Sequence, residues 1–125
     1  MARVLVAAQP PPGAYPTLPL GAGSRVLAFQ AVDAGLSNYT PLIEGKTLIL
    51  VKNAHATDPK TVTFTSVVDD LQRTGDITAY SLAAGAVALF GPFKAKGWAH
   101  ADVGQAGLWF GGSSADITVA VITLP

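Results

Sequence analysis

Charge is scarce in this sequence. Only 13% of its 125 residues are Asp, Glu, Lys or Arg, against about 25% in an average globular domain. Eight basic residues balance eight acidic ones, so no basic excess is present for binding a nucleic-acid backbone. Half of the residues are hydrophobic, which excludes an intrinsically disordered chain. A surface so poor in charge is better suited to packing against other chains than to free diffusion.

Cysteine is absent, which excludes a disulfide-stapled fold and a thiolate nucleophile or metal ligand. Long apolar runs are also missing. No stretch approaches the roughly 18 residues of a membrane span, so we expect no membrane contact. The apolar run 4–8 is shorter than the roughly 7–15 residues of a signal peptide's hydrophobic region, and prolines follow it. We expect residues 2–7 to form a short strand or arm.

Helical periodicity is missing as well, because no segment places apolar residues at i, i+3, i+4 and i+7 over several turns. Turn residues instead recur about every 8–12 positions from Arg25 onward, a spacing typical of β-sandwiches and barrels. The sequence predicts one all-β domain over residues 25–125, an antiparallel β-sandwich or jelly-roll-like barrel of about 7–8 strands. The expected strands are 25–32, 46–53, 60–67, 77–82, 86–90, 106–110 and 116–124.

Several of these strands carry more specific expectations. The strand 46–53 is nearly continuously apolar, so we expect it at the centre of a sheet and buried on both faces. The strand 60–67 alternates, with threonines on one side and Val62 and Phe64 on the other. The strands 77–82 and 86–90 flank a tight turn, which predicts a β-hairpin.

Residues 1–24 differ in composition from the rest of the chain. The stretch 8–24 holds five of the nine prolines and no charged residue, so it cannot form a helix or an inner strand. It carries Tyr15, Leu18 and Leu20 as apolar anchors, which favours an extended arm lying on its own domain or on a neighbour. We therefore expect an extended Pro/Gly-rich arm over 1–24, with these three residues as candidates for partner binding.

Residues suited to catalysis or metal binding do not form a recognisable set. His55 and His100 lie far apart in predicted loops, without further ligands at the short spacing of a zinc site. The carboxylates of loop 69–76 do not follow a calcium-loop pattern, and Arg73 lies among them as an ion-pair partner. The chain also lacks a hydrolase G-x-S-x-G motif and a phosphate-binding loop. We expect no enzyme activity, no cofactor and no bound metal.

Tryptophan supplies the remaining candidates for partner binding. Trp109 and Phe110 are adjacent on a predicted strand and face opposite sides, so one is in the core and the other at a sheet–loop contact or an interface. Trp98 lies in a predicted loop, where it either contacts a partner or covers the end of its own domain. An exposed group of Trp98 with Tyr39 or Tyr80 would instead indicate a sugar-binding site.

The stretch from 45 to 122 resembles a small family of tailed-bacteriophage virion proteins, the β-sandwich proteins that decorate or cement capsids. The matching segments are Gly-Lys-Thr-Leu-Ile-Leu-Val-Lys-Asn (45–53), Thr-Val-Thr-Phe-Thr (61–65), Thr-Gly-Asp-Ile-Thr-Ala-Tyr-Ser-Leu-Ala-Ala-Gly (74–85), Phe-Gly-Pro-Phe (90–93) and Thr-Val-Ala-Val-Ile (118–122). Residues 1–24 lie outside the resemblance. It consists of strand and turn patterns and transfers no functional residue.

This resemblance implies a non-enzymatic protein made in the host cytoplasm and located on the capsid surface of a virion. It would bind and stabilise the outer surface of a phage head, with the major capsid protein as its partner. We expect a homo-oligomer, with a trimer favoured. Two alternatives remain open: another virion component, such as a head–tail or tail protein, and a carbohydrate-binding β-sandwich module.

Overall fold

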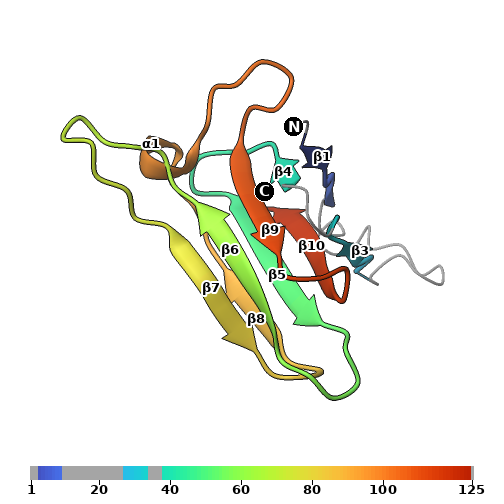
Figure 1. Cartoon of the computed structure of the whole chain (residues 1–125). Coiled ribbons are helices and arrows are strands. Elements are labelled where there is room, and N and C mark those ends of the chain that lie inside the picture. Colours follow the sequence, from blue (N-terminus) through green and yellow to red (C-terminus); the bar gives the residue numbers. More distant parts are fainter. Residues whose placement is uncertain (1–2, 10–26, 34–37, 125) are drawn as a thin grey trace, which may run out of the picture.

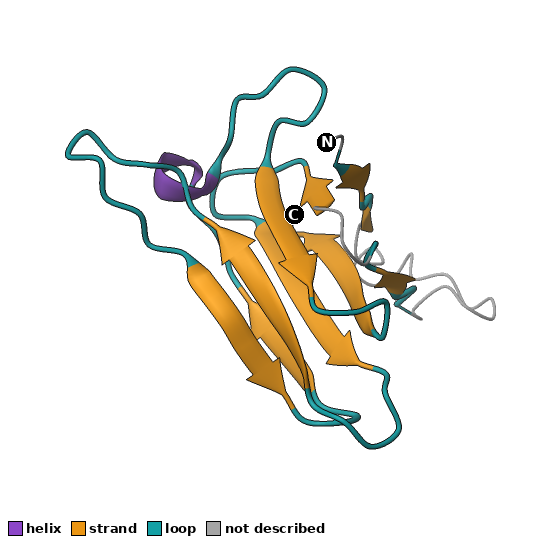
Figure 2. Ribbon diagram, viewed as in Figure 1, coloured by secondary structure: helices purple, strands orange, loops and turns teal. Residues whose placement is uncertain are grey.

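A computed structural model of the chain describes residues 3–9, 27–33 and 38–124. Two five-stranded sheets enclose a shared apolar core, the layout of a β-sandwich (Figure 1). The short α1 (Ala95–Trp98) is the only helix among these residues (Figure 2). No helix in this part of the chain is long and apolar enough to cross a membrane. The all-β fold class predicted from the sequence is confirmed.

We call the two layers the front sheet and the back sheet, as they lie in Figure 1. In spatial order, the front sheet consists of β1 (Val4–Leu5), β4 (Asn38–Thr40), β9 (Leu108–Gly112), β6 (Lys60–Thr65) and β7 (Ile77–Leu82). The back sheet consists of β2 (Ala8–Gln9), β10 (Ile117–Thr123), β5 (Thr47–Asn53) and β8 (Val87–Phe90), with β3 (Gln30–Ala31) also paired to β10.

Both sheets are mixed, which corrects the antiparallel sandwich expected from the sequence. The strand β1 runs parallel to β4, and β2 runs parallel to β10. The other strand pairs are antiparallel. The difference arises because residues 3–9 continue from the edge of one sheet to the edge of the other and join each with a two-residue strand.

The core lies between the sheets and is built from alternate residues of the long strands. Phe64 is at its centre, with its ring 4.7 Å from that of Phe90, 5.6 Å from Phe93 and 5.9 Å from Phe110. The predicted alternation of β6 is confirmed, since Val62 and Phe64 are fully buried and the threonines that alternate with them are not. Burial of such side chains contributes about 1.5–3 kcal/mol each.

The predicted β-hairpin of β7 and β8 is wrong. The two strands belong to different sheets, since β7 pairs with β6 and β8 pairs with β5. The connection 83–86 carries the chain across the core, and Gly85 N–H and Asn53 C=O form a 2.8 Å hydrogen bond that anchors it to the end of β5. A tight turn reverses the chain direction, but it does not determine which strand becomes the partner.

Two predicted boundaries also shift. The strand expected at 106–110 is observed two residues later, at Leu108–Gly112, because Gly111 and Gly112 belong to β9. A Cβ atom at Gly112 would lie 2.8 Å from Val32 Cγ2 and 2.9 Å from Ile117 Cβ, so this glycine permits close packing within the core. In the predicted first strand, the described residues pair only at Gln30–Ala31.

The N-terminal residues 3–9 belong to the folded domain in this structure. Val6 lies between β1 and β2 and is 2% exposed, as part of the core. An extended arm was expected over residues 1–24. Its part at residues 3–9 is instead paired with both sheets of the domain. The expected boundary at 24/25 falls outside the described residues.

Candidate interaction surface

The outer face of the back sheet carries apolar side chains on three adjacent strands. Leu50 lies at its centre, as the Cα partner of Leu89 on β8 and of Ala120 on β10. Ile49 and Val51 and the residues paired with them across the sheet face the core. The residues that alternate with them along each strand therefore face outward. The outward set on β5, β8 and β10 comprises Leu48, Leu50, Lys52, Val87, Leu89, Thr118, Ala120 and Ile122.

We call Leu48, Leu50, Val87, Leu89 and Ile122 the apolar face. Val87 is 52% exposed and Leu89 is 60% exposed, while the others are partly exposed. Lys52 is the one ionisable side chain in the outward set of these three strands. The sequence predicts that strand 46–53 is buried on both faces. In the structure the inner face is fully buried, whereas Leu48, Leu50 and Lys52 on the outer face are only partly buried, so the prediction is wrong for full burial of the outer face.

The strand β8 is also the edge of the back sheet, next to the apolar face. It pairs with β5 on one side, and no described strand pairs with its other side. The residues Val87–Phe90 contain no charge. Exposed edges usually carry lysine, proline or a bulge that blocks pairing with another chain. Proline occurs here only after the strand, at Pro92, so the edge of β8 itself has no such protection.

Trp109 lies on the outer side of the front sheet and is enclosed by its own chain. The guanidinium carbon of Arg3 lies 3.8 Å from the centre of its ring, and the His100 ring stacks on it at 3.8 Å with an interplanar angle of 4°. The indole N–H donates to the carbonyl of Gln105 at 2.7 Å. Phe110, the next residue along the strand, points to the opposite side and lies in the core. Trp109 therefore makes a sheet–loop contact within its own chain.

The stack on Trp109 places two titratable side chains, Arg3 and His100, in partly buried positions. Burial lowers the pKa of the Arg3 guanidinium, and the nearby charge of Asp102 acts in the opposite direction. The sequence places His100 in a loop. In the structure this histidine is partly buried, and its Nε2 lies 2.9 Å from the Thr65 carbonyl oxygen. Trp109 therefore serves as an anchor for Arg3 and His100 rather than as a free aromatic platform.

Trp98 covers one end of its own domain. It lies at the end of α1, and its ring meets that of Phe93 edge-on at 5.3 Å. It is partly buried against the core. The two predicted tryptophan candidates are thus both in contact with their own chain and partly buried by it.

A groove of about 610 Å³ lies beside α1 and is formed with the loop 67–73. Asp69 and Arg73 face each other there in an ion pair of 2.7 Å, which confirms the pairing expected from the sequence. The backbone N–H of Arg73 donates to Asp69 Oδ1 at 2.8 Å and is the main cause of the lowered pKa of Asp69. Both charged groups of this pair are therefore engaged with each other rather than open to the groove.

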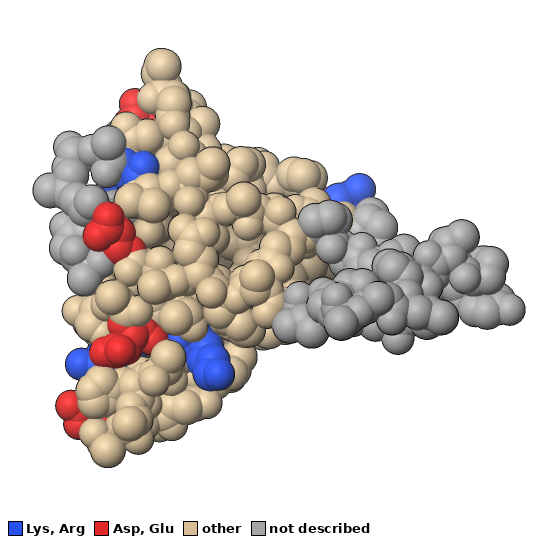
Figure 3. All heavy atoms as spheres, turned by 90° about the vertical axis from the view of Figure 1, so that its right-hand side faces the viewer, with Lys and Arg blue, Asp and Glu red and all other residues tan. Residues whose placement is uncertain are grey.

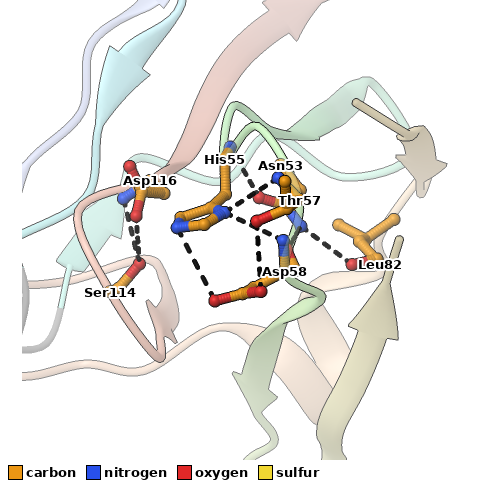
Figure 4. Close-up of polar contacts among 7 residues, drawn as sticks. All are labelled: Asn53, His55, Thr57, Asp58, Leu82, Ser114 and Asp116. Atoms are coloured by element: carbon orange, nitrogen blue, oxygen red, sulfur yellow. Dashed lines mark hydrogen bonds and ion pairs between the residues drawn. The ribbon is translucent and has the colours of Figure 1, made fainter. Parts of the chain in front are cut away.

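His55 organises the turn that follows β5 (Figure 4). Its Nδ1 accepts hydrogen bonds from the backbone N–H groups of Thr57 at 3.1 Å and Asp58 at 2.9 Å. The fully buried Asn53 donates to the carbonyls of Asp58 and Leu82, both at 2.9 Å, and accepts from the His55 N–H at 3.0 Å. These bonds hold the turn against β7, a structural role that the sequence does not predict for either residue.

A serine and two aspartates lie in the region of His55, as Figure 4 shows, but they do not form a catalytic triad. Ser114 Oγ donates to Asp116 Oδ2 at 3.3 Å, and His55 Nε2 lies 3.8 Å from Asp58 Oδ2. Among the described residues, no hydrogen bond joins Ser114 to His55. A nucleophile needs a base within hydrogen-bond reach, so this arrangement is structural.

Other predicted candidates lie outside the structure described. Tyr15, Leu18 and Leu20 fall among residues 10–26, of which nothing is described. Within the ranges 3–9, 27–33 and 38–124, no three His, Asp or Glu side chains gather as a metal site would require. Comparison of the chain with protein-family models, curated proteins and solved structures finds no match.

Proposed function

We propose that this chain is a non-enzymatic structural protein of a phage virion. It acts as a capsid decoration protein that binds the major capsid protein on the outer surface of the head and stabilises it. The apolar face is its contact surface. The proposal is supported by the resemblance of residues 45–122 to virion proteins and by the geometry of the back sheet.

The observation that carries this proposal is the exposed outer side of β8, next to the partly exposed outer side of β5. Strands that are apolar on both faces are typical of sheets covered on both sides. Here the front sheet covers only the inner side. Large apolar patches on soluble proteins mark interaction sites, so a second protein is the expected cover for the other side.

The partner surface is expected to be apolar and nearly uncharged, because Lys52 is the only charge on the outward set. An exposed edge strand beside it permits main-chain hydrogen bonds with an extended segment of the partner. A standard interface buries about 800 Å² on each partner. Binding in many copies on a lattice raises the overall affinity above that of a single contact.

The oligomer and the arm belong to the same proposal. Association as a homo-oligomer, with a trimer favoured, would place several apolar faces on one particle. Residues 10–24 would add contacts through Tyr15, Leu18 and Leu20. A jelly-roll type of connectivity is part of the proposal as well, within the observed all-β sandwich.

The carbohydrate-binding alternative is supported less well by the geometry. It requires exposed, coplanar aromatic rings. Trp98 and Trp109 instead pack on their own chain, and Tyr80 meets Phe90 edge-on at 5.3 Å. A glycan array with the full chain tests this alternative, and we expect no binding.

The direct test uses phage heads from the source of this sequence, prepared with and without the gene for this chain. Mass spectrometry of purified particles should find the chain in many copies per head. Added back to heads that lack it, the full chain should co-sediment with them and raise the temperature at which they open. Particles that never contain the chain, or heads that fail to bind it, would refute the proposal.

A further inference from the structure

The N-terminal residues 3–9 occupy a site formed by two sheet edges. Val4 and Leu5 pair with Asn38 and Tyr39 of β4, and Val6 N–H donates to the Tyr39 carbonyl at 2.9 Å. The site continues on the back sheet, where residues 8 and 9 pair with residues 121 and 122 of β10. We call β4, β10, Gln105 and Trp109 the strand-accepting site.

The side chain of Val6 makes this site part of the core. Val6 is 2% exposed and contacts the same cluster as the long strands. Without residues 3–9, the core between β4 and β10 would be open to water. The free-energy cost would be about 25 cal/mol for each Å² of apolar surface exposed. The site therefore needs an occupant with a small apolar residue at this position.

The polar contacts of the segment all go to distant parts of the chain. Arg3 N–H donates to Gln105 Oε1 at 2.6 Å, and its guanidinium covers the Trp109 ring. Gln9 exchanges two hydrogen bonds with the backbone of Ala28, at 2.6 and 3.0 Å. Gln30 Nε2 donates to the Leu5 carbonyl at 3.3 Å. The segment is therefore held as a bound peptide would be, by contacts that do not depend on which chain supplies it.

The connection to the rest of the chain is long enough to permit exchange. Seventeen residues, 10–26, separate the segment from Leu27. An extended chain spans at most about 3.3–3.6 Å per residue, so this length reaches at most about 55–60 Å. A compact domain of this size has a radius of gyration of about 14 Å. The strand-accepting site of an adjacent copy lies within that reach.

We propose that the strand-accepting site also binds residues 3–9 of a second copy of this chain, so that copies associate by exchanging their N-terminal strands. The exchanged and closed forms contain the same contacts and differ in the effective concentration of the segment. Exchange is therefore favoured where copies are concentrated. On the side that carries β1 and β3 in Figure 1, the middle of the described surface shows few Lys, Arg, Asp or Glu atoms, which lie mainly around it (Figure 3). This proposal does not depend on the function of the apolar face.

The absence of cysteine from the chain makes disulfide trapping a clean test. One batch carries Leu5→Cys and a second carries Tyr39→Cys, at positions that are Cα partners between β1 and β4. The full-length batches are mixed, incubated at high protein concentration and oxidised. Because each chain holds one cysteine, a disulfide between positions 5 and 39 forms only between copies.

Exchange predicts a covalent dimer between the two batches, identified by mass spectrometry of the linked peptides. Its yield should rise with the protein concentration during incubation and fall when Val6→Asp is added to the Leu5→Cys chain. A mixture of Leu5→Cys with Val103→Cys, which is exposed on a loop, reports random collision. A 5–39 yield no higher than this control would overturn the proposal.

A second pair keeps the test decisive if either variant fails to fold. Gln9→Cys and Ile122→Cys are Cα partners in the back sheet, at the other end of the site. Melting curves select the pair whose members retain the wild-type transition. The same dimer is expected from this pair, and a yield at the collision level would again count against exchange.

Discussion

Leu50 and Leu89 are cross-strand partners on the outer face of the back sheet, and neither is covered by the front sheet. Leu89 is 60% exposed although it lies in a regular strand. Such a pair stabilises the sheet by about 0.2–1 kcal/mol, which other residue pairs would supply equally well. Folding therefore does not require leucine at position 89, as expected if the residue serves the proposed binding.

Substitution of the exposed part of the apolar face should leave the fold intact. We expect Val87→Thr with Leu89→Thr to change the free energy of unfolding by less than about 1 kcal/mol, because threonine also favours strands. Urea unfolding followed by circular dichroism measures this. Val103→Thr, which is 93% exposed on a loop, is the matched control. A loss of several kcal/mol would mean that these residues are needed for stability.

Removal of the Val6 side chain should destabilise the domain. We expect Val6→Ala to lower the free energy of unfolding by about 2 kcal/mol, because it leaves a cavity where the two sheet edges meet. Leu5→Ala, at the neighbouring and half-exposed position, should cost less than about 1 kcal/mol. Chemical denaturation of both variants provides the comparison. Equal effects would show that residues 3–9 do not close the core.

Gly107 is fixed by space as well as by its backbone conformation. Its φ is +127°, and a Cβ atom would lie 2.2 Å from the Thr40 carbonyl oxygen. We expect Gly107→Ala to cost more than about 3 kcal/mol, or to prevent folding, since β4 cannot move away without losing its pairing with β9. Gly104→Ala has a positive φ but no atom nearby, so it should cost only about 1–2 kcal/mol. Melting temperatures of the two variants test this difference.

Acid should weaken the loop 66–76. Ser66 Oγ and N–H both donate to Asp76 Oδ1 at 2.7 Å, and these hydrogen bonds lower the pKa of Asp76. A lowered pKa in the folded state means that the stabilisation is present above the unfolded pKa of about 3.9 and is lost as the pH falls through the folded value. We expect the melting temperature to decrease at pH values below about 4.

Asp76→Asn should show a smaller dependence on pH in this range, because it has no carboxylate to protonate. Asp70→Asn removes an exposed carboxylate from the same loop and is the matched control. Thermal melting at a series of pH values between 2.5 and 6, at about 0.1 M salt, measures both. An unchanged acid slope in Asp76→Asn would contradict the role given to Ser66 and Asp76.

The strand content could be predicted because the long strands carry strong local patterns. Alternation marks β6, where Val62 and Phe64 enter the core, and continuous apolar sequence marks β5. The ion pair of Asp69 with Arg73 also followed from sequence, because both residues lie in one short loop. These features depend on neighbours in the chain.

The N-terminal strands and the crossing from β7 to β8 could not be predicted in the same way. Two-residue strands such as Val4–Leu5 have no periodicity of their own, and their parallel pairing depends on distant β4. The turn at 83–85 fits a hairpin locally, but the pairing of β8 with β5 places it in the other sheet. Long-range packing decided both cases.

The candidate surface has a signal in the sequence, although for strand 46–53 that signal predicts burial on both faces. The segments 46–53 and 86–90 are apolar at both odd and even positions, which indicates two apolar faces. A sequence does not show whether the same domain covers both. The tryptophans are large and were expected to bind a partner, yet Trp98 and Trp109 pack on their own chain, whereas Val87 and Leu89 are exposed.

Titration of gene-deleted phage heads with the wild-type chain and with the Val87→Thr, Leu89→Thr variant tests the role of the apolar face most directly. Co-sedimentation measures the bound copies per head at each free concentration, and Val103→Thr is included as the control. We expect the double variant to bind at least about tenfold more weakly, a loss of about 1.4 kcal/mol per copy, with wild-type binding by the control. Equal binding of all three proteins would contradict binding through the apolar face.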